Sequence, residues 1–169
     1  MKSEKVLSFT LQHLLALAVG AAICTCWVVQ AEAGETNIDH PKEISVYASL
    51  RSWHYVEPDA SYGDINEANY GLSAKAVWEP AGSPDVFIHV GGFDNTFNDL
   101  SIFGVIGYQA EFSESITAGF GAGLVSGYTK LRDSLGGVLP AAGVFVQWRA
   151  VHVAVLPGVV GFSLELKEF

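Results

Sequence analysis

Two short segments carry side chains suited to general acid–base chemistry. His54 follows Ser52 and Trp53, and Asp94 is followed directly by Asn95. A neutral imidazole can take a proton from a hydroxyl, and a carboxylate can orient the ring and stabilise the imidazolium that forms. The two segments are far apart in the chain, so this chemistry requires elements that bring them together.

Those elements are predicted to be β-strands. From residue 43 onwards, apolar residues alternate with small or polar ones at a period of two, as in Val86, Ile88 and Val90. His89 and His152 fall on the small and polar face, where we expect them to be hydrogen-bonded interior residues. The predicted strands lie at about 43–55, 64–78, 85–93, 99–111, 115–126, 137–147, 149–157 and 160–169.

A soluble β-sandwich would give the same alternation, but two further patterns favour a membrane barrel. Short connections alternate with longer ones, which is typical of outer-membrane proteins. Aromatic residues also gather at the strand ends and predict two interfacial girdles. One girdle would contain Trp53, Tyr55, Phe97 and Tyr128, and the other Trp78, Phe112, Trp148 and Phe169. We therefore predict an all-β protein, an eight-stranded antiparallel transmembrane β-barrel of the bacterial outer membrane, present as a monomer.

The barrel topology brings the two chemical segments to one rim. With both termini on the periplasmic side, the first and third strands end at the external rim. His54 closes the first strand, and Asp94 and Asn95 close the third. The apolar residues between Phe162 and Leu166 occupy even-numbered positions, whereas Phe169 is odd-numbered. All of them can face outward only if a bulge near the C-terminus shifts the alternation by one residue.

The N-terminal residues predict secretion. Lys2 and Lys5 precede an uncharged run from Leu14 to Val29 and the triplet Ala31-Glu32-Ala33, which is the order of a signal peptide. We expect cleavage after Ala33, leaving a short tail at 34–42 and the barrel at 43–169. Cys24 and Cys26 leave with the signal, so thiol chemistry and disulfides are excluded in the mature chain. That chain keeps 16 of the 18 acidic and 7 of the 9 basic residues, a charge of −9 that disfavours nucleic acid as a partner.

Several segments in one order carry a family resemblance. They are Ser52-Trp53-His54, Ile65 to Ser73, Gly91 to Asn98, Thr117 to Gly127, Val138 to Ala141, Leu156-Pro157-Gly158 and Leu166 to Phe169. Together these segments resemble the outer-membrane lipid A palmitoyltransferases. The resemblance implies transfer of a palmitoyl chain from a phospholipid donor to a lipid A acceptor, without a cofactor. It also implies that His54 is the catalytic histidine and Asp94 the aspartate.

Asn95 stands where the resembled family has a serine. Its amide could donate a hydrogen bond to a developing oxyanion. Thr96 carries a hydroxyl one position further on, but strict alternation predicts that it points to the other face.

Four other residues are candidates for substrate binding. Asn66 and Glu67 open the predicted second strand, where they either fill the lumen as a polar plug or shape a headgroup pocket. Arg51 has the inward parity of Tyr47, and a pair with Glu67 would use its charge. Pro140 either starts a strand or opens a weak point in the wall, since proline removes a ladder donor. Its position matches a proline of the resembled family beside which lipid is thought to enter.

Two alternatives to acyl transfer remain open. The same site could hydrolyse an acyl ester of lipid A or of a phospholipid, with water as the acceptor. The barrel could also bind lipid without catalysis, because Asn95 replaces the family serine and the family's N-terminal amphipathic helix is missing.

Overall fold

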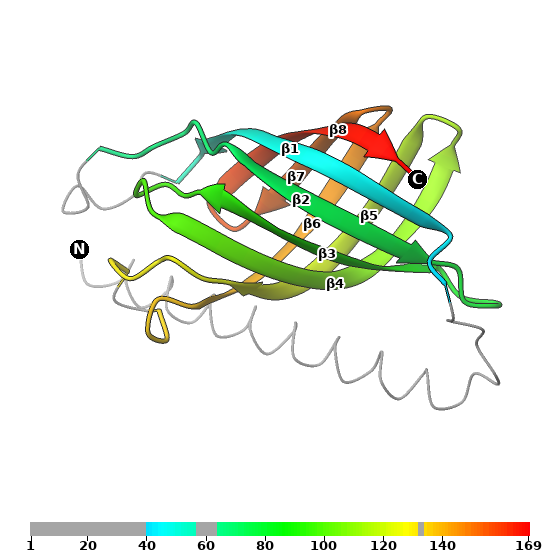
Figure 1. Cartoon of the computed structure of the whole chain (residues 1–169), viewed down its shortest axis with the longest axis horizontal. Coiled ribbons are helices and arrows are strands. Elements are labelled where there is room, and N and C mark those ends of the chain that lie inside the picture. The colour runs from blue at the N-terminus through cyan, green and yellow to red at the C-terminus, as the bar shows by residue number, and fades with distance from the viewer. Residues whose placement is uncertain (1–39, 57–63, 132–133) are drawn as a thin grey trace. The chain divides into compact units, whose positions relative to one another are not determined.

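The computed structural model describes residues 40–56, 64–131 and 134–169, so the predicted signal peptide and most of the predicted tail lie outside it. Within these ranges the regular elements are eight β-strands that close into one antiparallel barrel (Figure 1). This confirms the predicted all-β, eight-stranded barrel. No helix in the described ranges has the length and apolarity to cross a bilayer. The strands are β1 (Glu43–His54), β2 (Gly71–Trp78), β3 (Asp85–Asp94), β4 (Leu100–Ser113), β5 (Ile116–Val125), β6 (Leu139–Trp148), β7 (Val151–Leu156) and β8 (Val159–Glu168).

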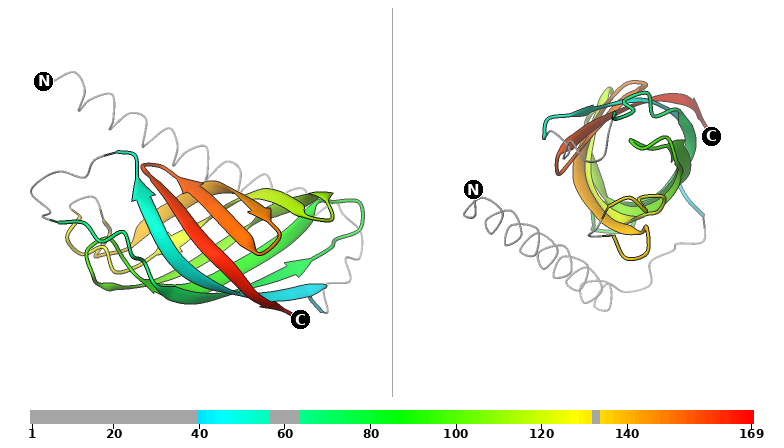
Figure 2. Two further views of the ribbon diagram at one scale, coloured as in Figure 1. Left: turned by 90° about the horizontal axis from the view of Figure 1, so that it is seen from above. Right: turned by 90° about the vertical axis from the view of Figure 1, so that its left-hand side faces the viewer.

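Each strand pairs with the next, and the ring closes where β1 pairs with β8 (Figure 2). Ser45 in β1 lies opposite Glu168 in β8, so the chain enters and leaves the barrel at the same end. We call this end the terminal rim. The opposite end, where β1, β3, β5 and β7 finish, is the loop rim. Short turns at 79–84, 114–115 and 149–150 join strands at the terminal rim. The loop rim has long connections at 55–70 and 126–138 but short ones at 95–99 and 157–158, so the predicted alternation in length holds only in part.

Side chains alternate across the barrel wall as the sequence predicts. On the outer face, Ile106 and Phe120 are 52% and 51% exposed. On the inner face, Tyr47 and Val77 are fully buried. The apolar side chains thus cover the outside of the barrel, which is the reverse of a soluble protein's surface.

Polar side chains cross the lumen nearer the terminal rim. Lys75 Nζ donates to Gln109 Oε1 at 3.2 Å and to Gln147 Oε1 at 3.4 Å. Tyr47 donates to the same Gln147 oxygen at 2.9 Å, and Gln147 Nε2 donates to Glu165 Oε2 at 2.6 Å. Because these buried groups satisfy one another, side chains fill this level of the lumen.

A bulge where β1 pairs with β8 changes which side chains of β1 face inward. The pairing shifts between Ser49 and Arg51. Beyond the shift Ser52 is buried and Arg51 is exposed. The prediction that Arg51 shares the inner face of Tyr47 is therefore wrong, because one extra residue reverses the parity of the strand.

A second bulge lies in β8, between Glu165 and Lys167. Beyond it, Phe169 exchanges backbone hydrogen bonds with Ile44 and is 66% exposed. The bulge that the alternation at Phe162–Leu166 required is thus confirmed, and it returns the terminal aromatic ring to the outer face.

The second strand begins later than predicted. β2 starts at Gly71, so Asn66 and Glu67 belong to the connection after β1 and do not open a strand. Asn66 Oδ1 accepts the Ala68 N–H at 2.9 Å. This local turn competes with ladder pairing, which the apolar pattern could not reveal.

The two predicted aromatic girdles are confirmed only in part, because some of their members are not exposed on the outer surface. At the terminal rim Phe112, Trp148 and Phe169 are exposed, and Trp78 is half-buried. At the loop rim Trp53 and Tyr55 are exposed, as predicted. The other two members, Phe97 and Tyr128, instead pack against each other inside the loops, with ring centroids 6.0 Å apart and Phe97 buried.

Candidate active site

His54 is the last residue of β1 and lies on the inner side of the loop rim. The bulge that buries Ser52 also turns His54 inward, because the two residues share a face. Its Nε2 lies 3.1 Å from Thr96 Oγ1. Its Nδ1 is buried and has no hydrogen-bond partner among the described residues. A basic nitrogen therefore contacts a hydroxyl at a distance suited to proton transfer.

Thr96 faces the lumen because the chain turns directly after β3. Asn95 Oδ1 accepts the N–H groups of Phe97 and Asp99 at 2.8 and 3.1 Å, and Asn98 adopts a left-handed φ of 60°. These contacts bend residues 95–99 into a tight turn. The prediction that Thr96 points to the other face is wrong, since strand alternation ends at Asp94.

Tyr128 is the second neighbour of the Thr96 hydroxyl. It comes from the connection between β5 and β6, and its phenol hydrogen-bonds to Thr96. Burial raises the pKa of Tyr128, so the phenol stays protonated at neutral pH. His54, Thr96 and Tyr128 thus form a chain of hydrogen-bonding groups from three separate segments.

The structure does not bring Asp94 to His54. Asp94 is exposed on the outer face, and its carboxylate makes no hydrogen bond or ion pair with any described residue. Only its backbone is engaged, through Tyr70 O and Asn69 Nδ2. The predicted convergence of these two segments at one rim holds for their backbones, while the expected pairing of imidazole and carboxylate is absent.

Asn95 is fully buried and already bonded on every side. Its Nδ2 donates to Ser101 Oγ at 3.0 Å and to the Gly127 carbonyl at 2.9 Å. An asparagine amide has two hydrogens, so neither is left for an oxyanion. The expected role of Asn95 as an oxyanion donor does not fit this geometry.

Glu67 is the carboxylate that lies beside His54. It accepts a hydrogen bond from Arg51 Nη2 at 3.0 Å, which confirms the predicted pair, and another from the backbone N–H of His54. The hydrogen bond from Arg51 holds the pKa of Glu67 below its ordinary value. The backbone carbonyl of Glu67 also accepts the Ser52 N–H at 2.8 Å. The pair therefore anchors the connection after β1 to the strand that carries His54.

Asn66 and Asn69 attach the same connection to the third strand and its turn. Asn66 donates its backbone N–H to the Thr96 carbonyl at 2.7 Å. Asn69 is buried, accepts a hydrogen bond from Ser52 Oγ and donates to the Asp94 carbonyl at 2.8 Å. Sequence reasoning missed Asn69 and Tyr128. Asn69 could have been noticed as a polar residue inside the predicted second strand, whereas Tyr128 stood out only as a member of an aromatic girdle.

Pro140 lies on the outer face of β6, opposite Leu124 of β5. On its other side, the pairing of β6 with β7 runs only from Trp148 to Val144. Residues 139–143 of β6 therefore pair with β5 alone. Pro140 is also the second residue of β6, so its position fits both the strand start and the weak point that the sequence left open.

The two interior histidines lie below the site. His89 Nε2 is 2.8 Å from Ser73 Oγ, which confirms the prediction of a hydrogen-bonded lumen residue. His152 is buried, as its parity predicts, and its ring stacks on Phe145 with centroids 5.0 Å apart. The described ranges contain no group of three histidine, cysteine or acidic side chains placed to hold a metal ion.

No protein-family model matches the chain, and no curated protein matches it.

Proposed function

We propose that this protein is a lipid A acyltransferase of the outer membrane, moving a palmitoyl-type chain from a phospholipid to lipid A. The observation that carries the proposal is the 3.1 Å contact between His54 Nε2 and Thr96 Oγ1 at the loop rim. A histidine and a hydroxyl at this distance are the arrangement of a nucleophile and its general base.

The outer surface supports a membrane setting. Outward residues in the middle of the strands, such as Ile88, Ile106 and Phe120, remain about half exposed. Aromatic side chains lie at both ends of this apolar surface, with Trp53 at one end and Trp148 at the other. A closed barrel has no unpaired sheet edge, which is what a strand protein needs in a bilayer. In this proposal the loop rim faces the outer leaflet, where lipid A resides.

The reaction follows from the contact. The Thr96 hydroxyl attacks the ester carbonyl of the phospholipid, and its proton moves to His54 Nε2 and then to the departing oxygen of the lysophospholipid. The hydroxyl of lipid A next attacks the acyl-threonine and gives its proton to His54, which returns it to the Thr96 oxygen as the acyl–oxygen bond breaks. No cofactor takes part.

Two neighbours assist this chemistry. Burial disfavours the positive charge that the His54 ring acquires when it takes the proton, and the Glu67 carboxylate offsets part of this cost. Glu67 acts on the His54 ring through its charge alone, because His54 Nδ1 has no hydrogen-bond partner among the described residues. Tyr128 holds the Thr96 side chain in place through the hydrogen bond between their two hydroxyl groups. Arg51 and Asn66 fix the connection after β1, so their part in substrate binding is indirect.

The wall beside Pro140 offers the donor a route from the bilayer. Because residues 139–143 of β6 pair only with β5, this section of the wall lacks the second set of ladder hydrogen bonds. We propose that the acyl chain of the donor enters here.

Mass spectrometry of lipid A from cells with and without the protein tests the proposal. Gain of one palmitoyl chain supports the transferase. Loss of an acyl chain would instead indicate a hydrolase, in which water replaces the sugar hydroxyl at the same contact. Unchanged lipid A and phospholipid would contradict both and leave a lipid-binding barrel.

A further inference from the structure

We infer that Asn95 is a positioning residue that fastens three loop-rim segments into one unit and so holds the Thr96 hydroxyl against His54. The segments are the connection 64–70, the turn 95–99 and the stretch 126–131. The role of Asn95 in catalysis rests on the proposed function. The joining of the three segments by its hydrogen bonds, here called the fastening, does not.

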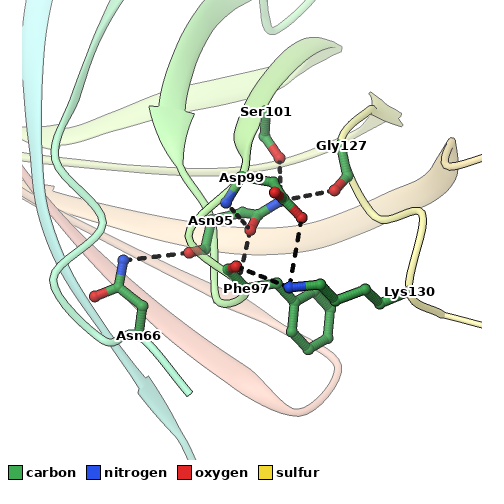
Figure 3. Close-up of polar contacts among 7 residues, drawn as sticks. All are labelled: Asn66, Asn95, Phe97, Asp99, Ser101, Gly127 and Lys130. Carbon is green, nitrogen blue, oxygen red and sulfur yellow. Dashed lines mark hydrogen bonds and ion pairs between the residues drawn. The ribbon is translucent and has the colours of Figure 1, made fainter. Parts of the chain in front are cut away.

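The side chain of Asn95 joins the turn to the stretch 126–131 (Figure 3). Its two Nδ2 hydrogens go to Ser101 Oγ and to the Gly127 carbonyl. Its oxygen accepts the backbone N–H groups of Phe97 and Asp99 within the turn. The Asn95 side chain has no solvent-exposed surface and its amide is fully paired, so losing a hydrogen-bond partner there is costly.

The main chain of Asn95 extends the fastening to the connection 64–70. Asn66 Nδ2 donates to the Asn95 carbonyl at 3.2 Å, and the Asn66 N–H donates to the Thr96 carbonyl. Thr96 is therefore held between two fixed neighbours, and its side chain has little freedom to leave His54.

Lys130 provides a second tie between the same turn and stretch. Its Nζ donates to the Phe97 carbonyl at 3.2 Å and lies 3.8 Å from Asp99 Oδ2 and 5.5 Å from the centre of the Phe97 ring (Figure 3). Tyr128, which bonds to Thr96, stands between Gly127 and Lys130 in the chain. The two ties therefore place Tyr128 at the site.

The substitution Asn95→Asp tests the fastening with almost no change in size. The carboxylate can still accept from Phe97 and Asp99, but it cannot donate to Ser101 or Gly127, and it faces the Gly127 carbonyl with a negative charge. When protonated, the carboxyl regains one donor, and burial should bring this about above the ordinary pKa of an aspartate. The neighbouring titratable groups are the same in the variant and the wild type; they are Asp99, Lys130 and Tyr128. Comparing the two proteins at each pH therefore cancels the effect of these groups and leaves that of the new carboxyl.

Amide hydrogen exchange of the folded barrel in lipid vesicles gives the first readout. At neutral pH, Asn95→Asp should accelerate exchange in 95–99 and 126–131 by about tenfold or more. The ratio of the variant's exchange rate to that of the wild type should fall towards one as the pH is lowered through the pKa of the new carboxyl. The matched control is Asn98→Asp, an exposed position in the same turn whose left-handed φ an aspartate tolerates. If both variants exchange alike, the fastening is wrong.

Acyl transfer gives the second readout. Asn95→Asp should lower kcat with little change in KM, and acidification should restore its rate relative to wild type. Faster transfer with unchanged exchange would mean that residue 95 acts in the chemistry itself, which overturns a positioning role. An inactive wild type would refute the proposed function, while the exchange data would still decide on the fastening.

Ser101→Ala covers the case in which Asn95→Asp fails to fold. It removes one acceptor of the Asn95 amide and a hydroxyl that donates to the Ser126 carbonyl at 2.6 Å. We expect faster exchange in the same two segments, by a smaller factor. Unchanged exchange in 126–131 would overturn the inference.

Discussion

The ring of His54, at the end of β1, lies 3.1 Å from the hydroxyl of Thr96, in the turn after β3. Strand alternation alone would have placed Thr96 on the opposite side of the barrel wall. In the proposed mechanism this contact assigns the chemistry to Thr96 and not to Asp94, and variants of the two residues distinguish these assignments.

Thr96→Val should abolish acyl transfer, because valine matches threonine in shape and lacks the nucleophilic oxygen. Thr96→Ser should keep much of the activity, and Asp94→Asn should leave it nearly unchanged, since Asp94 points outward. Rates of transfer to lipid A in vesicles measure all three. A large loss in Asp94→Asn alone would restore the histidine–aspartate pair and remove Thr96 from the mechanism.

His54→Ala should lower transfer by about 100-fold to 10,000-fold, the usual contribution of a general base. The barrel should still form, because His54 ends its strand and makes one side-chain hydrogen bond. Migration of unheated and heated samples on a detergent gel checks the fold. Equal activity in the variant and the wild type would place the chemistry elsewhere.

Tyr128→Phe should reduce kcat by about tenfold while leaving KM and stability nearly unchanged, since it removes one hydrogen bond to Thr96 and retains the packing on Phe97. The matched control is Tyr55→Phe. Tyr55 donates to the Leu156 carbonyl at the same rim, and its hydroxyl is not bonded to Thr96. If both variants lose activity equally, the contact with Thr96 has no special role.

Glu67 should titrate below its ordinary value near 4.5, because the Arg51 hydrogen bond stabilises the carboxylate. A carboxyl whose pKa is lower in the folded state stabilises that state above its unfolded pKa. The contribution disappears as the pH falls through the lowered value. Carboxyl carbon shifts in nuclear magnetic resonance report the midpoint. Arg51→Gln should raise it, and an unchanged midpoint would show that the pair has no influence on the titration.

Ile106→Arg should cost about 2–4 kcal/mol of folding free energy in lipid vesicles, as expected for a charge at the bilayer midplane. Ile106 is outward in the middle of β4 and lies opposite Ile88 and Ala122. Leu135→Arg is the control, since Leu135 is 83% exposed in the connection between β5 and β6. Urea titrations measure both. A neutral effect of Ile106→Arg would contradict a lipid-facing wall.

The strands could be predicted because one rule governs them. A barrel wall places every second side chain inside, so the alternation around His89 or Ile106 predicts both strand and face. The need for a bulge before Phe169 followed from a break in that same rule. The bulge near Arg51 had no such mark, because polar and apolar residues mix at the end of β1 and the sequence shows no break in parity.

The site was harder to predict because, apart from His54, its residues lie beyond the strands. Thr96, Tyr128 and Glu67 occupy turns and connections, where hydrogen bonds of individual side chains set the direction of the chain. The pairing of Arg51 with Glu67 could be predicted from charge alone, even though the predicted face of Arg51 and the predicted strand start at Glu67 were wrong. The contact between His54 and Thr96 depends on the turn that Asn95 forms, and no periodic pattern encodes it.

The pairing of β1 with β8 has a consequence for the order of folding. Ser45 and Glu168, which face each other across this pair, lie near opposite ends of the barrel sequence. Loop closure over such a separation is slow, and the edges of β1 and β8 stay unpaired until it occurs. A chain truncated within β8 cannot close the ring, so the last strand controls both the completion of folding and the protection of the first strand from aggregation.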